Sequence, residues 1–328
     1  MPDSPTTLTP TTESPDGPAP TAPAPRARVH QGRWIAREGV AGYVFLLPWL
    51  VGFFGLTLGP VLASLWLSFT DYDLLSAPRW IGWENYVDMV HDSRYWQSVR
   101  VTLFYVVVSV PAKLVFALVL ALLLNRGLRG VAIYRAIYYV PSLLGASVAI
   151  AILWRQVFGG DGIVNVALRW LGWSDPPSWL ADPSVSIYSL IALSVWEFGS
   201  PMIIFLAGLR QIPRMYYEAA NVDGAGKWSQ FWRITLPLLT PLVLFNLILQ
   251  LIGAFQSFTP AFVISGGTGG PVDSTLFYSL YLYTQAFSSL HMGYGAAMAW
   301  VLLAVIAIVT AAVFWSSKYW VFYMEQSR

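Results

Sequence analysis

The sequence predicts an all-α membrane protein with six transmembrane helices. The chain of 328 residues is 56% hydrophobic and only 11% charged, whereas soluble domains carry about 25% charged residues. Its apolar residues gather in six long stretches, and Lys and Arg are concentrated in alternate loops between them. Because so few polar residues could not coat a water-soluble globule, we expect lipid to surround most of the chain.

Each of the six stretches is long enough to cross a bilayer. A spanning helix needs about 20 predominantly apolar residues. The stretches lie at about 40–69, 99–124, 133–157, 185–208, 236–264 and 292–316. An even number of spans places the two termini on the same side of the membrane.

The charge of the loops predicts the orientation. The N-terminal tail, the loops 125–132 and 209–235, and the C-terminus together hold twelve Lys and Arg residues. The loops on the other side hold three: Arg79, Arg94 and Arg169. Loops rich in Lys and Arg stay in the cytoplasm. We therefore expect both termini and the 209–235 loop to be cytoplasmic.

The N-terminal residues differ in composition from the rest of the chain. Residues 1–29 are mostly Pro, Thr and Ala, with almost no large apolar side chain. Such a segment cannot bury enough area to offset the entropy lost on folding. We therefore expect residues 1–38 to be a disordered cytoplasmic tail and residues 39–328 to form the transmembrane domain. A secretory signal is not expected, because the first apolar run begins near Val40 and is too long.

Several kinds of site are disfavoured by composition. Cys is absent, which excludes disulfides and thiolate metal sites, and the three His residues are scattered. The chain has no G-x-x-x-x-G-K-[ST] motif for nucleotide phosphates. A net charge of +2 without a basic run gives no support for nucleic-acid binding. We expect no catalytic residue, metal or cofactor in this chain.

The 209–235 loop has the pattern of two short helices. After Pro213, which suits the first turn of a helix, Met215, Ala219 and Val222 recur at helical spacing. The Asp223-Gly224 pair ends this helix, because Gly adopts the left-handed conformation at little cost. Helices this short are marginal alone, so a partner surface is expected to pack on them. The alternative is an ordinary loop with an interfacial amphipathic helix.

A family resemblance appears in the same loop. The stretch EAANVDGAGKWSQFWRITLP, from Glu218 to Pro237, resembles the E-A-A-x-x-D-G-A-x5-F-x2-I-x-L-P motif of binding-protein-dependent ABC importer permeases. No motif position departs from the pattern. The resemblance implies a type I importer permease (MetI-like) fold, in which this loop is a coupling helix docked on an ATP-hydrolysing subunit. The residues implied to carry the coupling are Glu218, Ala219, Ala220, Asp223, Gly224 and Ala225.

Other stretches point to one branch of that family. YVFLLPWLVGFF, WIGWENYVDMVHDSRYWQSV and GGTGGPVDSTLFYSLYLYTQAF are similar to the carbohydrate branch and favour a MalF-like or UgpA-like subunit. Two features depart from it. Arg100-Val101-Thr102 stands where an Asn-Thr pair often opens the second span, and the first outer loop, of about 30 residues, lacks the large outer domain of the maltose permease.

The resemblance also implies partners and a location. The chain would pair with a second, MalG-like permease in a bacterial inner or plasma membrane. Two ATP-binding subunits would bind ATP and Mg below it, and an extracytoplasmic sugar-binding protein would dock outside. The chain itself is then a transporter subunit and not an enzyme.

A polar stripe in the fifth span is the candidate substrate path. Asn246, Gln250, Gly253 and Ser257 follow at helical spacing, with Gln256 and Phe258 just beside the stripe. Amide side chains can donate to and accept from sugar hydroxyls, and polar residues inside a span tend to face a wet path. The alternative is helix–helix packing, in which amides and small residues are common.

Three further polar or small sites lie within spans. Glu197 in the fourth span is a candidate for the substrate path or, alternatively, a structural carboxyl. Lys113 in the second span could pair with it or extend to an interface. In the third span, Ser142, Gly145 and Ala149 share a face that would allow close helix packing.

The sequence leaves rival functions open. A permease for glycerol phosphate or another polar solute would want basic residues in the path, for which Lys113 alone is thin support. A proton-driven secondary transporter would use Glu197 as the carrier and would be expected to hold more buried carboxylates. A membrane-embedded enzyme would require a cluster of His, Asp or Glu at an interface, which the sequence does not show.

Overall fold

The computed structural model describes residues 43, 45–126, 131–145 and 147–322. Contacts within the chain divide it into two units, residues 1–59 and 60–328. The predicted tail, 1–38, lies outside the described residues. The first long helix, Phe45–Leu67, contains the π-helical turn η1 (Phe53–Leu58) and α2 (Gly59–Leu67). None of its described residues in the most apolar stretch is buried, as expected of a helix that faces lipid.

Within the described residues, four helices are long and apolar enough to cross a membrane, and six if two bent pairs each count as one span. The spans made without a sharp bend are Phe45–Leu67, α4 (Ser93–Leu124), the run Lys227–Ser265, which is interrupted at residues 256–258, and α15 (Met292–Trp320). The bent pairs are α5 (Val131–Leu144) with α6 (Val148–Val157), at 100°, and α8 (Ser186–Trp196) with α9 (Gly199–Gln211), at 42°. Each of the six predicted spans thus has a helical counterpart, and the third and fourth are broken.

The break in the fourth span follows from Pro201. In a continuous helix the carbonyl of Glu197 would accept from the N–H of residue 201, but proline has none and its ring crowds that carbonyl. The Glu197 carbonyl instead accepts from the hydroxyl of Ser142 on α5, at 2.9 Å. The same hydroxyl accepts from the backbone N–H of Ser200, also at 2.9 Å. Ser142 therefore supplies a hydrogen-bond partner both to the free carbonyl before the break and to the free N–H after it.

The fifth span covers the predicted residues 236–264 but is interrupted near its end. Helix α12 (Leu236–Phe255) stops at Phe255, and α13 (Thr259–Ser265) begins after three intervening residues. Pro260 explains the interruption, because it cannot donate to the carbonyl of residue 256 and disfavours a helix there. The predicted stripe is therefore not one helical face: Ser257 and Phe258 lie in the break, although Asn246, Gln250 and Gly253 are helical.

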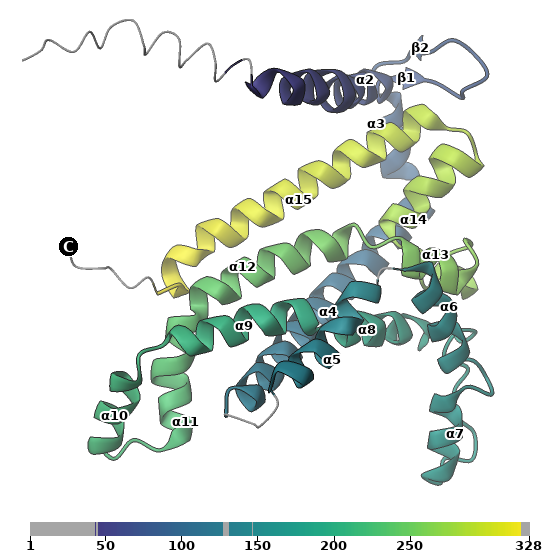
Figure 1. The fold of residues 1–328 in the computed structure, drawn as a ribbon. Coiled ribbons are helices and arrows are strands. Elements are labelled where there is room, and N and C mark those ends of the chain that lie inside the picture. Colours follow the sequence, from purple (N-terminus) through teal and green to yellow (C-terminus); the bar gives the residue numbers. More distant parts are fainter. Residues whose placement is uncertain (1–42, 44, 127–130, 146, 323–328) are drawn as a thin grey trace, which may run out of the picture. The chain divides into compact units, whose positions relative to one another are not determined.

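Helix α4 lies at the centre of the second unit. It packs against α8, α9, α12 and α14 (Tyr278–Tyr283), and α12 lies beside α15 (Figure 1). Its buried face recurs every three or four residues, as in Val106, Val110, Leu114, Ala117 and Ala121. Ala117 and Ala121 are fully buried, and their small side chains allow close approach of the neighbouring helices.

Short elements complete the unit. One end holds the antiparallel pair β1 (Thr70–Asp71) and β2 (Arg79–Trp80), α3 (Glu84–His91), η3 (Pro271–Asp273) and η4 (Thr284–Ser288). Helix α7 (Ile163–Trp170) follows α6. At the other end, α10 (Arg214–Val222) and α11 (Lys227–Gln230) turn back beside each other (Figure 1), and η2 (Phe231–Thr235) leads into α12.

Candidate functional site

A cavity of about 490 Å³ lies between α4, α8, α12 and the break before α13. We call it the amide-lined cavity, after Gln250 and Gln256 in its wall. Six of the seven residues predicted for the substrate path line it: Glu197, Gln250, Gly253, Gln256, Ser257 and Phe258. The break in the fifth span turns Gln256, Ser257 and Phe258 toward the same space as the helical Gln250 and Gly253.

Asn246 does not line this cavity. Its side chain is fully buried one turn earlier on α12. Neither its amide nitrogen nor its amide oxygen has a hydrogen-bond partner among the described residues, and the hydroxyl of Ser109 on α4 is also unpartnered there. Unpaired polar groups in an apolar interior are costly. A path role for Asn246 stays a prediction.

Helix α4 supplies residues of the wall that the fifth-span stripe did not reveal. Tyr105 and Lys113 both line the cavity, and Ser109 lies between them at the spacing of one helical turn. This i, i+4, i+8 series of polar residues inside an apolar span is a signal that the sequence held. Sequence reasoning considered Lys113 alone and did not connect it with Tyr105.

Lys113 and Glu197 form an ion pair in the wall. The ammonium nitrogen lies 3.4 Å from Glu197 Oε2, with 10% and 22% of the two side chains exposed. Of the two alternatives for Lys113, pairing is therefore the one that the structure shows. Glu197 is held in place at the break of the fourth span, where Ser142 accepts and donates as described above.

Gly145 gives the Glu197 side chain its space. A Cβ atom at Gly145 would overlap the carboxyl group of Glu197. The predicted close packing around Ser142 and Gly145 is therefore present, although the partner is the broken fourth span. Ala149 is exposed beyond the 100° bend. The prediction that it shares one helical face with Ser142 and Gly145 is wrong, because α5 ends at Leu144.

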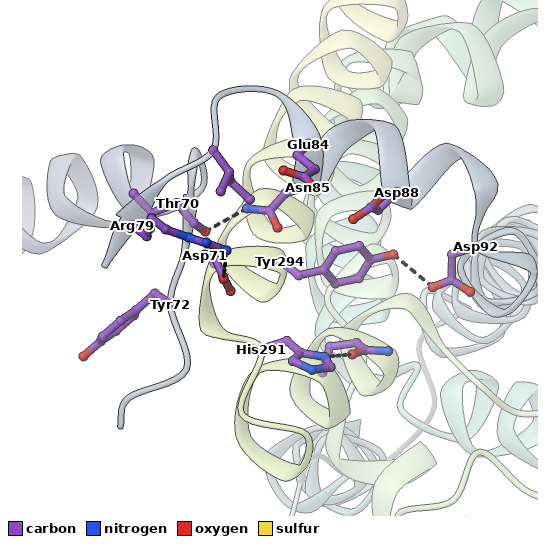
Figure 2. A pocket seen from close by; sticks show the side chains of 13 residues that line it. Thr70, Asp71, Tyr72, Arg79, Glu84, Asn85, Asp88, Asp92, His291 and Tyr294 are labelled. Carbon is purple, nitrogen blue, oxygen red and sulfur yellow. Dashed lines mark hydrogen bonds and ion pairs between the residues drawn. The ribbon is translucent and has the colours of Figure 1, made fainter. Parts of the chain in front are cut away.

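A second cavity of about 430 Å³ lies where β1, β2, α3 and the start of α15 meet. Its wall carries four carboxylates, Asp71, Glu84, Asp88 and Asp92, and we call it the acidic cavity (Figure 2). Arg79 pairs with Asp71 at 3.0 Å. Nevertheless, the described residues include no group of three or more side chains suited to hold a metal ion.

Hydrogen bonds hold the acidic cavity together. Asn85 Nδ2 donates to the carbonyls of Ser68 and Thr70, at 2.9 and 3.0 Å. Asp92 accepts from the hydroxyls of Tyr281 and Tyr294. Burial opposes ionisation of Asp92, but these hydrogen bonds outweigh it and lower the pKa of the carboxyl. Burial and the bond to Asp92 raise the pKa of Tyr281 to about 12.

Several aromatic residues of this end are structural. Tyr278 and Tyr281 are almost fully buried, and the Tyr278 hydroxyl donates to the carbonyl of Met298 at 2.8 Å. Arg94 makes two hydrogen bonds to Asp273, at 2.9 and 2.7 Å, which join the start of α4 to the segment before α14. His291, to which the sequence gave no role, lines the acidic cavity and lies 3.1 Å from Gln285 Oε1.

The 209–235 loop folds as two helices joined at a glycine, as predicted. Gly224 has φ +73°, in the left-handed region, and α10 ends just before it. Gln230 Nε2 donates to Asn221 Oδ1 at 2.7 Å and to the carbonyl of Ala225 at 2.8 Å. The hydroxyls of Tyr217 and Thr235 lie 2.9 Å apart. These contacts tie the two helices of the loop together.

The loop presents apolar side chains and several of the predicted coupling residues on its surface. Val222 is 89% exposed, and Met215 and Trp228 are also exposed. Glu218 and Ala219 lie on the exposed part of α10 as well, whereas Ala220 is half-buried. Exposed apolar side chains gathered on one surface are typical of an interaction site. That a partner packs on Met215, Ala219 and Val222 stays a prediction.

Comparison with known proteins places these features in a family. Residues 90–320 match the family model described as "Binding-protein-dependent transport system inner membrane component". The chain is 50% identical over 299 residues to a probable ABC transporter permease protein, YesP, of Bacillus subtilis, covering 91% of this chain and 97% of that protein. It is 34% identical to the lactose transport system permease protein LacF of Rhizobium radiobacter, covering 85% and 94%.

Solved structures share the fold. The chain resembles a subunit of a bacterial ABC transporter involved in the import of the acidic polysaccharide alginate, with a TM-score of 0.71 and 23% identity, covering 87% of this chain and 97% of that one. A structure of such a transporter in complex with a periplasmic protein gives a TM-score of 0.74 at 22% identity, covering 87% and 96%.

Proposed function

Since the chain belongs to the family of binding-protein-dependent transport system inner membrane components, we propose that it moves a sugar or oligosaccharide through its amide-lined cavity. The observation that carries this proposal is the convergence of polar side chains from three spans on one cavity. Relatives named for lactose and for trehalose and maltose transport support the choice of cargo.

The cavity has the chemistry that a sugar requires. Gln250 and Gln256 each offer an acceptor oxygen and two donors, and Ser257 can donate or accept. Phe258 and Tyr105 add aromatic surface to the wall. A sugar ring likewise combines hydroxyls on its rim with apolar C–H groups on its faces. Asn246, one turn from the cavity, would join this path in a conformation that exposes it.

The 209–235 loop is proposed to couple the cavity to ATP hydrolysis. Its coupling residues, Glu218, Ala219, Ala220 and Asp223 to Ala225, would dock on an ATP-binding subunit that holds ATP and Mg. Because the loop continues directly from α9 and into α12, a push on it would reach the walls of the amide-lined cavity. The spans would then change between inward-facing and outward-facing arrangements as rigid bodies.

The assembly and orientation complete the proposal. The chain would act with a second permease, two ATP-binding subunits and a sugar-binding protein on the opposite side of the membrane. Both termini and the 209–235 loop would be cytoplasmic, since they carry most of the Lys and Arg residues. Residues 39–328 would form the permease domain, and the chain would not hydrolyse ATP itself.

The geometry gives less support to a phosphate-bearing cargo and to transport driven by protons. A phosphate-bearing solute would need a surplus of positive charge, but Lys113 is already paired with Glu197. A proton-driven carrier would have Glu197 as its only carboxylate among the described residues of the amide-lined cavity, because Asp71, Glu84, Asp88 and Asp92 line a different cavity.

Reconstitution of the full complex in vesicles tests the proposed function. We expect sugar uptake that requires ATP and stops when the ATP-binding subunits carry an inactivated phosphate-binding lysine. A proton uncoupler should leave the uptake unchanged. Uptake at full rate without ATP hydrolysis would overturn the coupling role, and uptake abolished by the uncoupler at constant ATP would favour the proton-driven alternative.

A further inference from the structure

The ion pair in the amide-lined cavity has unused hydrogen-bonding capacity. The separation of 3.4 Å is longer than the roughly 2.7–2.9 Å of a strong charge-assisted hydrogen bond. Among the described residues, Lys113 donates only to Glu197, and the Glu197 side chain accepts only from Lys113. An ammonium has three donors and a carboxylate about four acceptor sites, so both groups keep unused capacity, and both residues line the cavity.

A purely structural role accounts poorly for this pair. Charges within a span are costly, and a buried pair is commonly no more stabilising than apolar side chains of similar volume. The break of the fourth span is already held by Ser142 through two hydrogen bonds. The carboxyl group nevertheless occupies the space left by Gly145, and Glu197 and Lys113 both line the cavity.

We propose that Lys113 and Glu197 together bind a vicinal diol of a neutral sugar in the amide-lined cavity. One hydroxyl donates to the Glu197 carboxylate, and its neighbour accepts from the Lys113 ammonium. Gln250 and Gln256 bind the remaining hydroxyls. This inference rests on the proposed function and names the cargo more closely.

The charge balance of the pair sets its specificity. A neutral diol adds no charge to a wall that carries one positive and one negative group. A sugar carboxylate would place a second negative charge beside Glu197, which is unfavourable because like charges repel. Because a uronate would upset this balance of one positive and one negative charge, the pair selects neutral polyhydroxylated rings over uronates, and over deoxy sugars that lack one member of the diol.

Gly145 acts as a positioning residue for this site. Because a Cβ atom there would overlap the Glu197 carboxyl, Gly145→Ala should displace the carboxyl without removing it. The variant should weaken selection for the diol while the charges of the cavity stay the same.

Uptake by the reconstituted complex tests the inference. The probes are maltose, lactose, trehalose and an alginate oligosaccharide, each on saturating sugar-loaded binding protein, followed by deoxy analogues of whichever neutral sugar is transported. We expect wild type to transport a neutral sugar and to reject at least one deoxy analogue by about tenfold or more. Glu197→Gln and Lys113→Met should each slow uptake of the parent sugar about tenfold and abolish the discrimination.

Matched variants separate binding from packing. The double variant Lys113→Met/Glu197→Leu fills a similar volume with apolar groups, and it should assemble normally yet remain unable to discriminate. Asp161→Asn, which breaks the exposed pair with Arg169 outside the cavity, should behave as wild type.

Two results would overturn the inference. Single variants that retain full discrimination, or a double variant that regains it, would show a structural ion pair. ATP-driven uptake of the alginate oligosaccharide in preference to every neutral sugar would reject the neutral diol while leaving the proposed importer in place. Failure to transport any probe would instead reject sugar cargo and this inference together.

Discussion

The two cavities of the second unit are similar in size but differ in the elements that form their walls and in the charges that these walls carry. The amide-lined cavity, of about 490 Å³, is built from residues inside spans and carries one ion pair. The acidic cavity, of about 430 Å³, is built mainly from the connecting elements β1, β2 and α3 and carries four carboxylates. A polar residue within an apolar span is energetically costly and therefore points to a function. An acidic residue in a solvated loop carries no such cost.

A polar residue therefore helps to locate a functional site only where the neighbouring residues in the sequence are apolar. Glu197 and the fifth-span residues of the amide-lined cavity could be selected from the sequence because they interrupt apolar runs. Those of the acidic cavity could not, because carboxylates are common at surfaces. Experiments on the first cavity should therefore change transport, and experiments on the second should change stability.

The largest expected effect lies in neither cavity. Gly224→Pro should abolish ATP-driven uptake, because Gly224 has φ +73° and proline requires about −65°. The two helices tied by Gln230 could not keep their geometry. Uptake in vesicles and co-purification of the ATP-binding subunits are the measurements. Gly226→Ala is the matched control, because a Cβ there meets no atom within 4 Å. Normal uptake by Gly224→Pro would show that the loop does not couple ATP hydrolysis to transport.

A smaller loss of transport is expected in the amide-lined cavity. Gln250→Leu removes an amide from the wall and should change uptake by about tenfold for the affected sugar, the size expected for a lost hydrogen bond that leaves a partner unpaired. The unfolding midpoint of the purified complex should stay the same. If uptake kinetics were unchanged across several sugars, Gln250 would be a packing residue. The expectation that the amide-lined cavity governs transport would then be wrong.

Two glycines, one in each cavity, are expected to differ in how strongly substitution by alanine lowers stability. A Cβ at Gly293 would overlap the carbonyl of Thr70, whereas a Cβ at Gly253 in the amide-lined cavity meets no atom within 4 Å. We expect Gly293→Ala to destabilise the protein by about 1–3 kcal/mol, the usual cost of overpacking, and Gly253→Ala to leave stability nearly unchanged. Thermal unfolding of both variants in detergent is the measurement; equal midpoints would contradict the packing around Thr70.

The smallest effect concerns the pH dependence of the acidic cavity. Because the pKa of Asp92 is lowered in the folded state, its stabilising contribution is present above the ordinary value of 3.8 and is lost as pH falls below it. Because the pKa of Tyr281 is raised to about 12, its contribution is present below pH 10 and is lost as pH rises from about 10 to about 12.

Tyr281→Phe provides the corresponding variant. It should cost about 1–2 kcal/mol through the lost hydrogen bond and should flatten the alkaline loss of stability, with uptake at pH 7 retained. Tyr188→Phe, an exposed tyrosine on α8, is the control. An alkaline profile unchanged by Tyr281→Phe would assign that loss of stability to another group.

Local pattern predicted much of this molecule and missed its interruptions. Hydropathy identified all six spans, and the Asp223-Gly224 pair located the turn between α10 and α11. The breaks at Glu197 and Gln256 were overlooked, although Pro201 and Pro260 stand four residues after them. In a helix each of those carbonyls would need the N–H that proline lacks, so these breaks were readable in principle.

Hydropathy and helical periodicity act over neighbouring residues, so the spans, the turn in the 209–235 loop and the polar residues of the fifth span could be predicted from the chain alone. Three features became visible only in the folded molecule: the pairing of Lys113 with Glu197, the room that Gly145 leaves for that carboxyl, and the hydrogen bonds from Tyr281 and Tyr294 to Asp92. Those contacts join residues 84, 52, 189 and 202 positions apart. Their formation depends on how separate spans pack, which no local pattern encodes.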